Sequence, residues 1–345
     1  MTTNPTGSTG SGMPTTTLGA HGPQVSVQGL GCMGMSDFYS DQFGDTGAEE
    51  SRATLERALE LGVTLFDTAD MYGFGRNEEL VGPFVRAHRD EVLLATKFAI
   101  ERREDDPTQR AVRNDPAYIR QAVDASLRRL GLDHIDLYYM HRRNPEVPLA
   151  ESVGAMAELV AAGKVRHLGL SEVSGAELRE AYAVHPIAAL QSEWSLFSRD
   201  VERTAVPAAA ELGVALVAYS PLGRGFLTGS FSNANELAAD DFRNHQPRFT
   251  GDNAAHNAAL LAPVHKIAAE RGVTVGQVAL AWVQQRAQVH GLPVIPIPGT
   301  RKRSRLEENA AAASLILTPE ELGELEPIAA QVAGDRYADM RSISS

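Results

Sequence analysis

The sequence predicts an α/β protein that folds as a single-domain (β/α)8 TIM barrel, and two observations support this. From residue 49 onward, short apolar segments alternate with amphipathic helical segments, which is typical of a parallel sheet covered by helices. Together with an earlier segment at 25–31, the apolar segments number eight, and eight strand–helix units close a barrel. A doubly wound open sheet is the alternative.

The elements follow in order along the chain. The first expected helix begins near Ala48, and later ones cover 117–130 and 149–162. Glycine repeatedly stands between a helix and the next strand, where it adopts the left-handed conformation that ends a helix at low steric cost. These glycines are Gly62, Gly131, Gly163, Gly213 and Gly272. The expected strands are 25–31, 63–70, 92–98, 135–141, 165–172, 188–194, 214–221 and 293–299.

Composition narrows the function classes. The chain has 345 residues, 43% of them hydrophobic, and a net charge of −12, which argues against nucleic-acid binding. No apolar run approaches the roughly 20 residues of a membrane helix. Residues 1–13 read as a disordered tail without a secretion signal, and residues 14–340 as the barrel with an N-terminal strand cap. One cysteine, Cys32, rules out an internal disulfide and fits a cytoplasmic location.

Gly29, Gly31 and Gly34 have the G-x-G-x-x-G spacing of a Rossmann dinucleotide site. That motif requires a helix that opens on the glycines and an acidic residue at the end of the next strand. Residues 36–41 have no helical periodicity, and the acids at the expected distance stand at a helix start. We therefore interpret the spacing as coincidental.

Polar residues stand at the ends of three consecutive predicted strands. Asp67 ends the second strand, Lys97 the third and His141 the fourth, and Tyr72 follows Asp67 closely. Chemistry in such barrels takes place at the carboxyl ends of the strands, and neighbouring strands lie about 5 Å apart. Each residue alone has an ordinary explanation, as a turn cap, a solvent-reaching lysine or a rim histidine. Their joint occurrence at neighbouring strand ends favours a catalytic site.

These four groups suit proton transfer to a carbonyl oxygen. Tyrosine has a pKa near 10, and a neighbouring ammonium group such as that of Lys97 is expected to lower the pKa of Tyr72. Asp67 would hold Lys97 charged, and His141 would position the substrate oxygen. Such a site, with an acid but neither metal nor nucleophile, fits hydride transfer from a nicotinamide cofactor.

At this point the chain resembles the aldo-keto reductase family over nearly all of residues 14–340. The most similar branch contains enzymes that resemble pyridoxal reductase and perakine reductase. The blocks that carry the resemblance are GLGCMGMS, FDTADMYGFGRNEELVG, ATKF, YYMHR, GKVRHLGLSEVS, LQSEWSLFSRD, AYSPLGRGFLTG and IPIPGTRKRSRLEEN. The family's catalytic Asp, Tyr, Lys and His match Asp67, Tyr72, Lys97 and His141. The resemblance implies reduction of small-molecule aldehydes and ketones with Tyr72 as the general acid.

The resemblance also implies NADPH as the cofactor, with the adenosine 2′-phosphate at the basic segment near residue 301. Glu172 departs from the Asn common in the family. A loop at about 224–256 would cover the cofactor. Met33, Phe38, Tyr39 and Trp194 would line the substrate pocket, and ordinary packing is the alternative for each of them. Arg142 and Arg143 would lie beside the barrel mouth and suit an anionic carbonyl substrate, with ordinary surface arginines as the alternative. The implied cofactor residues are Gly31, Cys32, Met33, Ser171, Glu172, Gln191, Tyr219, Ser220, Pro221, Leu222, Gly223, Arg224, Gly299, Thr300, Arg301, Lys302, Arg305, Glu308 and Asn309.

Three rival functions make different demands on the sequence. A metal-dependent hydrolase on the same barrel would need clustered ligands such as H-x-H, and a short-chain dehydrogenase would need Tyr-x-x-x-Lys; neither motif occurs. A regulatory subunit resembling the potassium-channel β-subunits would keep the fold and cofactor with very slow turnover. That alternative stays open. We expect no nucleic-acid or membrane partner, and the oligomeric state does not follow from the sequence.

Overall fold

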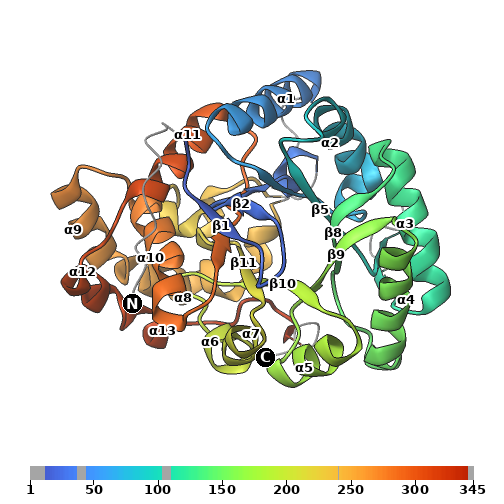
Figure 1. Ribbon diagram of the computed structural model, residues 1–345. Helices are drawn as coiled ribbons and strands as arrows, with labels where there is room; N and C mark the ends of the chain where they lie inside the picture. Colours follow the sequence, from blue (N-terminus) through green and yellow to red (C-terminus); the bar gives the residue numbers. More distant parts are fainter. Residues whose placement is uncertain (1–11, 37–43, 103–109, 240, 341–345) are drawn as a thin grey trace, which may run out of the picture.

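The computed structural model describes residues 12–36, 44–102, 110–239 and 241–340, and within them eight parallel strands form a barrel surrounded by helices (Figure 1). The strands lie in the order β12-β11-β10-β9-β8-β5-β4-β3. Barrel strands that follow one another in the sequence are therefore neighbours in the sheet. The predicted fold class is thus confirmed. The strands are β3 (Leu30–Gly31), β4 (Leu65–Asp67), β5 (Leu93–Phe98), β8 (Ile135–Met140), β9 (Val165–Ser171), β10 (Ile187–Glu193), β11 (Ala215–Tyr219) and β12 (Val294–Pro296).

Glycines close the barrel between its first and last strands. Gly31 pairs in parallel with Gly299, and the Gly29 N–H donates to the Pro296 carbonyl at 3.0 Å. A Cβ atom on Gly29 would lie 2.9 Å from Ile297 Cγ2 and from the Leu65 carbonyl oxygen, so no larger residue fits there without a shift. Residues Met33–Met35 then form a short 3-10 helix and not the α-helix of a Rossmann unit. The two glycines are explained by barrel closure.

The predicted first strand, 25–31, is divided in the structure. Val25 belongs to β2 (Gln24–Ser26), which forms an antiparallel hairpin with β1 (Thr15–Thr17), and only β3 enters the barrel. The Ser26 N–H donates to Thr64 Oγ1 at 2.8 Å, directly before β4, so the hairpin covers the amino-terminal end of the barrel. Leu18 and Val25 from the hairpin pack with side chains inside the barrel. The carboxyl ends of the barrel strands lie opposite.

A larger apolar core lies between the sheet and the outer helices. The helix that was expected to begin near Ala48 begins four residues earlier, at Gly44. All five predicted helix-ending glycines have φ between 65° and 84°, as the left-handed conformation requires. The helices are α1 (Gly44–Glu60), α2 (Arg76–Ala87), α3 (Pro116–Leu130), α4 (Leu149–Ala161), α5 (Gly175–Val184), α6 (Val201–Thr204), α7 (Val206–Leu212), α8 (Gly251–Ala259), α9 (Ala262–Arg271), α10 (Val275–His290), α11 (Arg303–Ala311), α12 (Pro319–Leu325) and α13 (Ile328–Gln331).

Two irregular regions follow barrel strands. After β5 the chain forms a short antiparallel hairpin, β6 (Ile100–Arg102) with β7 (Arg110–Val112), which the sequence did not predict. After β11, the expected loop consists of four short 3-10 helices: η3 (Gly223–Thr228), η4 (Ala234–Glu236), η5 (Phe242–His245) and η6 (Pro247–Phe249). Nowhere in the described ranges is a helix long and apolar enough to cross a membrane.

Candidate active site

The four predicted catalytic residues come from adjacent strands. Asp67 is the last residue of β4, Lys97 lies near the end of β5, and His141 directly follows β8. These three strands are neighbours in the sheet, so their carboxyl ends meet at the same rim. Tyr72 begins η2 (Tyr72–Gly75), a 3-10 helix in the turn after β4. The structure therefore brings together residues that are up to 74 positions apart in the chain.

Lys97 is at the centre of the site. Its Nζ donates to Asp67 Oδ1, to the Thr68 carbonyl at 2.8 Å and to Tyr72 Oη at 3.3 Å. The second Asp67 oxygen accepts from Gln191 Nε2 at 2.8 Å. Lys97 has no exposed surface and Asp67 is 4% exposed. A buried charge requires this degree of pairing, because its hydration has been lost.

Burial changes the electrostatics that the sequence suggested. It raises the pKa of Tyr72 above its ordinary value, and the neighbouring Lys97 charge offsets only part of this rise. Lys97 thus lowers the pKa of Tyr72 as expected, but burial, which the sequence did not reveal, raises it by more. Burial also acts to lower the pKa of Lys97, but Asp67 and Tyr72 outweigh it and raise that pKa. At neutral pH the pair is thus a protonated phenol beside an ammonium group.

His141 faces the phenol as a neutral imidazole. The rings of Tyr72 and His141 are 6.0 Å apart between centroids, with an interplanar angle of 85°. Burial, the Lys97 charge and the Arg142 charge together hold the pKa of His141 well below its ordinary range. Its Nδ1 is buried, and no group in the described residues hydrogen bonds to it. The site thus combines a protonated phenol with an uncharged imidazole.

The residues expected near a nicotinamide ring stand at the next strand ends. Ser171 ends β9, and Gln191 and Tyr219 lie on β10 and β11. Glu172 has φ of 53°, and its carboxylate accepts the Glu193 N–H at 2.9 Å. The same carboxylate pairs with the Arg336 guanidinium at 3.3 to 3.4 Å. This ion pair links Glu172 to the C-terminal segment.

Sequence reasoning missed the part of the C-terminal segment that reaches this site. Arg336 is buried, and Tyr337 Oη lies 3.3 Å from Tyr219 Oη. The Arg224 guanidinium lies 4.7 Å from the centre of the Tyr337 ring, and it also donates to Glu193 Oε2 at 3.0 Å. No motif or spacing connects residues 336–337 with strand ends more than a hundred residues earlier. The sequence itself therefore carries no signal for these contacts.

The turn 220–224 has an unusual backbone. Ser220 and Arg224 have φ of 48° and 58°, a region that side chains other than glycine rarely adopt. The Gly223 N–H donates to the Ser220 carbonyl at 2.9 Å, and Pro221 is buried while Leu222 is half-buried. The peptide groups of this turn are held at the mouth, beside Tyr219.

The basic segment after β12 lies at the start of α11. Lys302 precedes the helix and provides no side-chain cap. Arg303 pairs with Glu50 at 3.0 Å, whereas Arg305 is exposed and Arg301 half-exposed. Thr300 Oγ1 accepts the Lys302 N–H at 3.1 Å. The segment is thus a cluster of cations at a helix amino terminus, an arrangement that attracts phosphate.

Four other residues that were predicted to contact the cofactor have the following surroundings. The Glu308 carboxylate accepts the Thr274 hydroxyl at 2.7 Å, and Asn309 is buried within α11. Cys32 is buried in the core, and burial raises the pKa of its thiol. Met33 packs with the side chains around Tyr72.

Of the four residues expected to line the substrate pocket, the prediction is wrong for Trp194. Trp194 is fully buried, donates to Glu202 Oε1 at 3.0 Å and contacts the His290 ring, so it belongs to the core behind β10. Phe38 and Tyr39 lie outside the described residues. Met33 alone of the four remains next to Tyr72.

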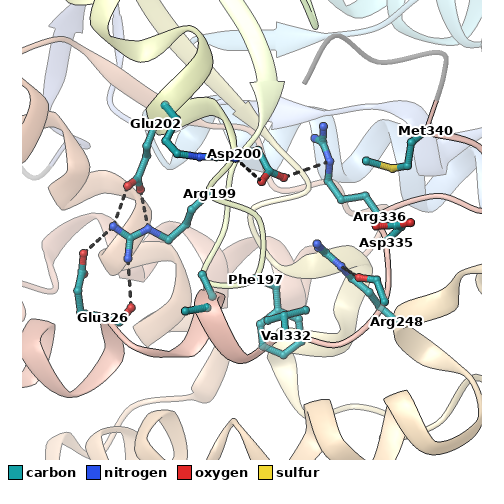
Figure 2. A pocket seen from close by; sticks show the side chains of 14 residues that line it. Phe197, Arg199, Asp200, Glu202, Arg248, Glu326, Val332, Asp335, Arg336 and Met340 are labelled. Atoms are coloured by element: carbon teal, nitrogen blue, oxygen red, sulfur yellow. Dashed lines mark hydrogen bonds and ion pairs between the residues drawn. The ribbon is translucent and has the colours of Figure 1, made fainter.

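A cavity of about 530 Å³ lies apart from these four residues (Figure 2). Its walls come from the loop after β10, from η6 and from the C-terminal segment, and they include Phe197, Arg248 and Arg336. None of Asp67, Tyr72, Lys97 or His141 lines it. The candidate catalytic residues are therefore identified by their own contacts and not by this cavity. In the portion of the chain that the structure covers, no group of three or more His, Cys, Asp or Glu side chains could hold a metal ion.

Solved structures of bacterial enzymes are similar to this chain. The glycerol dehydrogenase AKR11B4 from Gluconobacter oxydans is 29% identical, with a TM-score of 0.78 over 91% of this chain and 94% of that one. The holo form of the aldo-keto reductase AKR11C1 from Bacillus halodurans is 25% identical, with a TM-score of 0.72 over 95% and 99%. An aldo/keto reductase from Klebsiella pneumoniae, in complex with NADP and acetate, is 27% identical, with a TM-score of 0.68 over 93% and 98%.

The family comparison agrees with these structures and with the geometry. Residues 29–330 match the model of the aldo/keto reductase family, which is most of the chain and includes all four candidate catalytic residues. With the strand order and the strand-end residues described above, this match settles the assignment. The chain belongs to the aldo/keto reductase family.

Proposed function

We propose that the protein is an NADPH-dependent reductase of aldehydes and ketones in which Tyr72 is the general acid. The observation that carries the proposal is the position of Lys97 Nζ, which bonds both Asp67 and Tyr72 Oη in a buried site. The neighbouring neutral imidazole of His141 completes the arrangement. These groups can deliver a proton and a hydrogen bond to one carbonyl oxygen.

In this proposal, each side chain has a defined task. Tyr72 gives its phenolic proton to the carbonyl oxygen as that oxygen gains negative charge. Lys97 stabilises the tyrosinate that remains, and Asp67 keeps Lys97 charged and in position. The uncharged His141 can donate one hydrogen bond to the same oxygen, so it orients the substrate without competing for the proton. NADPH, when bound, supplies the hydride that reduces the carbonyl carbon.

The residues around the mouth suit a dinucleotide phosphate. Ser171 and Gln191 offer a hydroxyl and an amide where a carboxamide would lie, and Tyr219 offers a ring face. Arg301, Lys302 and Arg305 gather positive charge at the amino terminus of α11, which suits a 2′-phosphate. An acidic protein with a net charge of −12 that nevertheless concentrates cations here favours NADPH over NADH.

The test is turnover with both nucleotides on a panel of neutral aldehydes, for wild type and Arg305→Gln. NADPH labelled with deuterium at the transferable position should give labelled alcohol, with kcat/KM higher for NADPH than for NADH. Arg305→Gln should reduce the NADPH preference, whereas Arg128→Gln, an exposed change on α3, should leave it unchanged. NADPH binding without turnover on any carbonyl would refute the reductase proposal and favour a regulatory subunit.

A further inference from the structure

The carboxylates described above at the mouth each have a cation. The pairs are Asp67 with Lys97, Glu172 with Arg336, and Glu193 with Arg224. All of these groups are buried or nearly so, as paired charges in a protein interior must be. Arg336 also lies 3.9 Å from Asp200, so the cations of these pairs are already engaged by carboxylates. A further cation at the mouth without an ion pair of its own would be available to an anionic ligand.

Arg142 is such a cation. It directly follows His141, and its Nη1 donates to the His141 carbonyl at 2.7 Å and to Ser171 Oγ at 3.2 Å. Both acceptors are uncharged, and no carboxylate of the described ranges forms an ion pair with Arg142. The nearby Glu172 is already bonded to Arg336 and to the Glu193 N–H. Arg142 thus forms no direct ion pair within the described residues, and the Glu172 charge acts on it only at longer range.

The neighbouring arginine differs in this respect. Arg143 Nη1 pairs with Glu177 Oε1 at 3.0 Å, at the start of α5. Sequence reasoning treated the two arginines alike, whereas the structure separates Arg143, which forms a direct ion pair, from Arg142, which forms none within the described residues. Arg143 is therefore a matched control for Arg142.

The charge of Arg142 acts at the reacting end of the site. Burial and Lys97 depress the pKa of His141, and Arg142 contributes to the same depression. Burial raises the pKa of Tyr72, and Arg142 is among the cations that oppose this rise. Because Arg142 directly follows His141 and donates to Ser171 at the end of β9, it lies at the same rim of the barrel as the candidate catalytic groups. The basic segment at α11 belongs to another part of the chain and serves the opposite end of the cofactor.

We propose that Arg142 makes this site selective for carbonyl substrates that carry a carboxylate, an inference that rests on the function proposed above. A guanidinium group matches a carboxylate with two parallel N–H donors, and it binds it most strongly where water is excluded. A substrate with its carbonyl oxygen at Tyr72 and its carboxylate at Arg142 would form a direct ion pair with Arg142. A neutral substrate would leave Arg142 without such a pair.

The experiment compares 4-carboxybenzaldehyde with its neutral methyl ester, methyl 4-formylbenzoate. The kcat/KM ratio of acid to ester is measured for wild type, Arg142→Gln, Arg142→Lys and Arg143→Gln. Wild type should favour the acid, and Arg142→Gln should lower the ratio at least about 10-fold, the contribution of one hydrogen bond to a charged group. The loss should be mainly in KM. Arg142→Lys should recover part of the ratio, and Arg143→Gln should keep it.

Binding provides a second readout that does not depend on turnover. Calorimetry on the NADP-saturated protein compares 4-(hydroxymethyl)benzoate with neutral methyl 4-(hydroxymethyl)benzoate, in wild type and Arg142→Gln. The proposal requires tighter binding of the carboxylate to wild type and loss of this difference in the variant. Charge-selective binding without any aldehyde turnover would refute the reductase function while the role of Arg142 stands.

Two results would overturn the proposal. Equal losses for acid and ester in Arg142→Gln, with weaker NADPH binding, would make Arg142 a cofactor ligand acting through Ser171. A wild-type protein that binds or reduces the carboxylate no better than the neutral analogue would show that the charge of Arg142 serves no anionic substrate.

Discussion

Replacing Lys97 with methionine tests how the buried charges depend on one another. Lys97→Met removes an ammonium group with no exposed surface and three hydrogen bonds, while the side chain keeps a similar length. Asp67 is then left 4% exposed with a single side-chain donor, Gln191 Nε2 at 2.8 Å. Breaking a buried ion pair by removing one partner costs about 3–5 kcal/mol. We expect Lys97→Met to lose this amount of unfolding free energy.

The double variant Asp67→Asn/Lys97→Met identifies the cause. It removes both charges and retains an acceptor for Gln191, so most of the lost free energy should return. Lys164→Met is the control, because Lys164 pairs with Asp124 at 2.5 Å where both side chains are partly exposed, and such pairs contribute about 1 kcal/mol or less. Equilibrium urea unfolding followed by circular dichroism measures all four proteins. A single variant within about 1 kcal/mol of wild type, or a double variant as unstable as the single one, would refute the reasoning.

Three further predictions follow from other contacts. If Tyr72 is the general acid, reduction needs a protonated phenol, and because burial raises the pKa of Tyr72, the midpoint of any Tyr72-dependent alkaline loss of kcat/KM should lie above the ordinary pKa of tyrosine. A midpoint below that ordinary pKa would contradict this. Gly29→Val places side-chain atoms against Ile297 and the Leu65 carbonyl, so it should lower the free energy of unfolding, measured in urea, by about 1–3 kcal/mol. Gly154→Ala, with open space at its Cβ on α4, should leave that free energy unchanged or raise it. Arg336→Met should lower the melting temperature measured by calorimetry, because it leaves the Glu172 carboxylate buried without a cation, and Arg336→Lys should recover part of the loss; equal melting temperatures for wild type and Arg336→Met would show that this pair does not stabilise the fold.

The barrel could be predicted well from the sequence because the patterns that indicate strands and helices involve residues close together in the chain. Alternating periodicity and helix-ending glycines depend on residues near one another in the chain, and all barrel strands but the first, and the left-handed glycines, are found where they were expected. Local signals do not say which sheet a short apolar segment joins. Val25 was therefore assigned to the barrel, although it belongs to the hairpin that covers the amino-terminal end of the barrel.

The site was predictable as far as strand ends determine it. Asp67, Lys97 and His141 meet because neighbouring strands end at one rim. Burial and long-range contacts were not predictable. The net rise in the pKa of Tyr72 depends on how completely water is excluded, and the contact between Arg336 and Glu172 joins residues 164 positions apart.

The most direct test of the central claim is NADPH oxidation with a neutral aldehyde by wild type and Tyr72→Phe, with the NADPH dissociation constant measured by fluorescence for both. Phenylalanine keeps the ring that faces His141 and removes only the hydroxyl that Lys97 bonds. If Tyr72 is the general acid, kcat should fall about 100-fold or more while the dissociation constant stays within a few-fold of wild type. Equal kcat values for the two proteins would mean that another group delivers the proton.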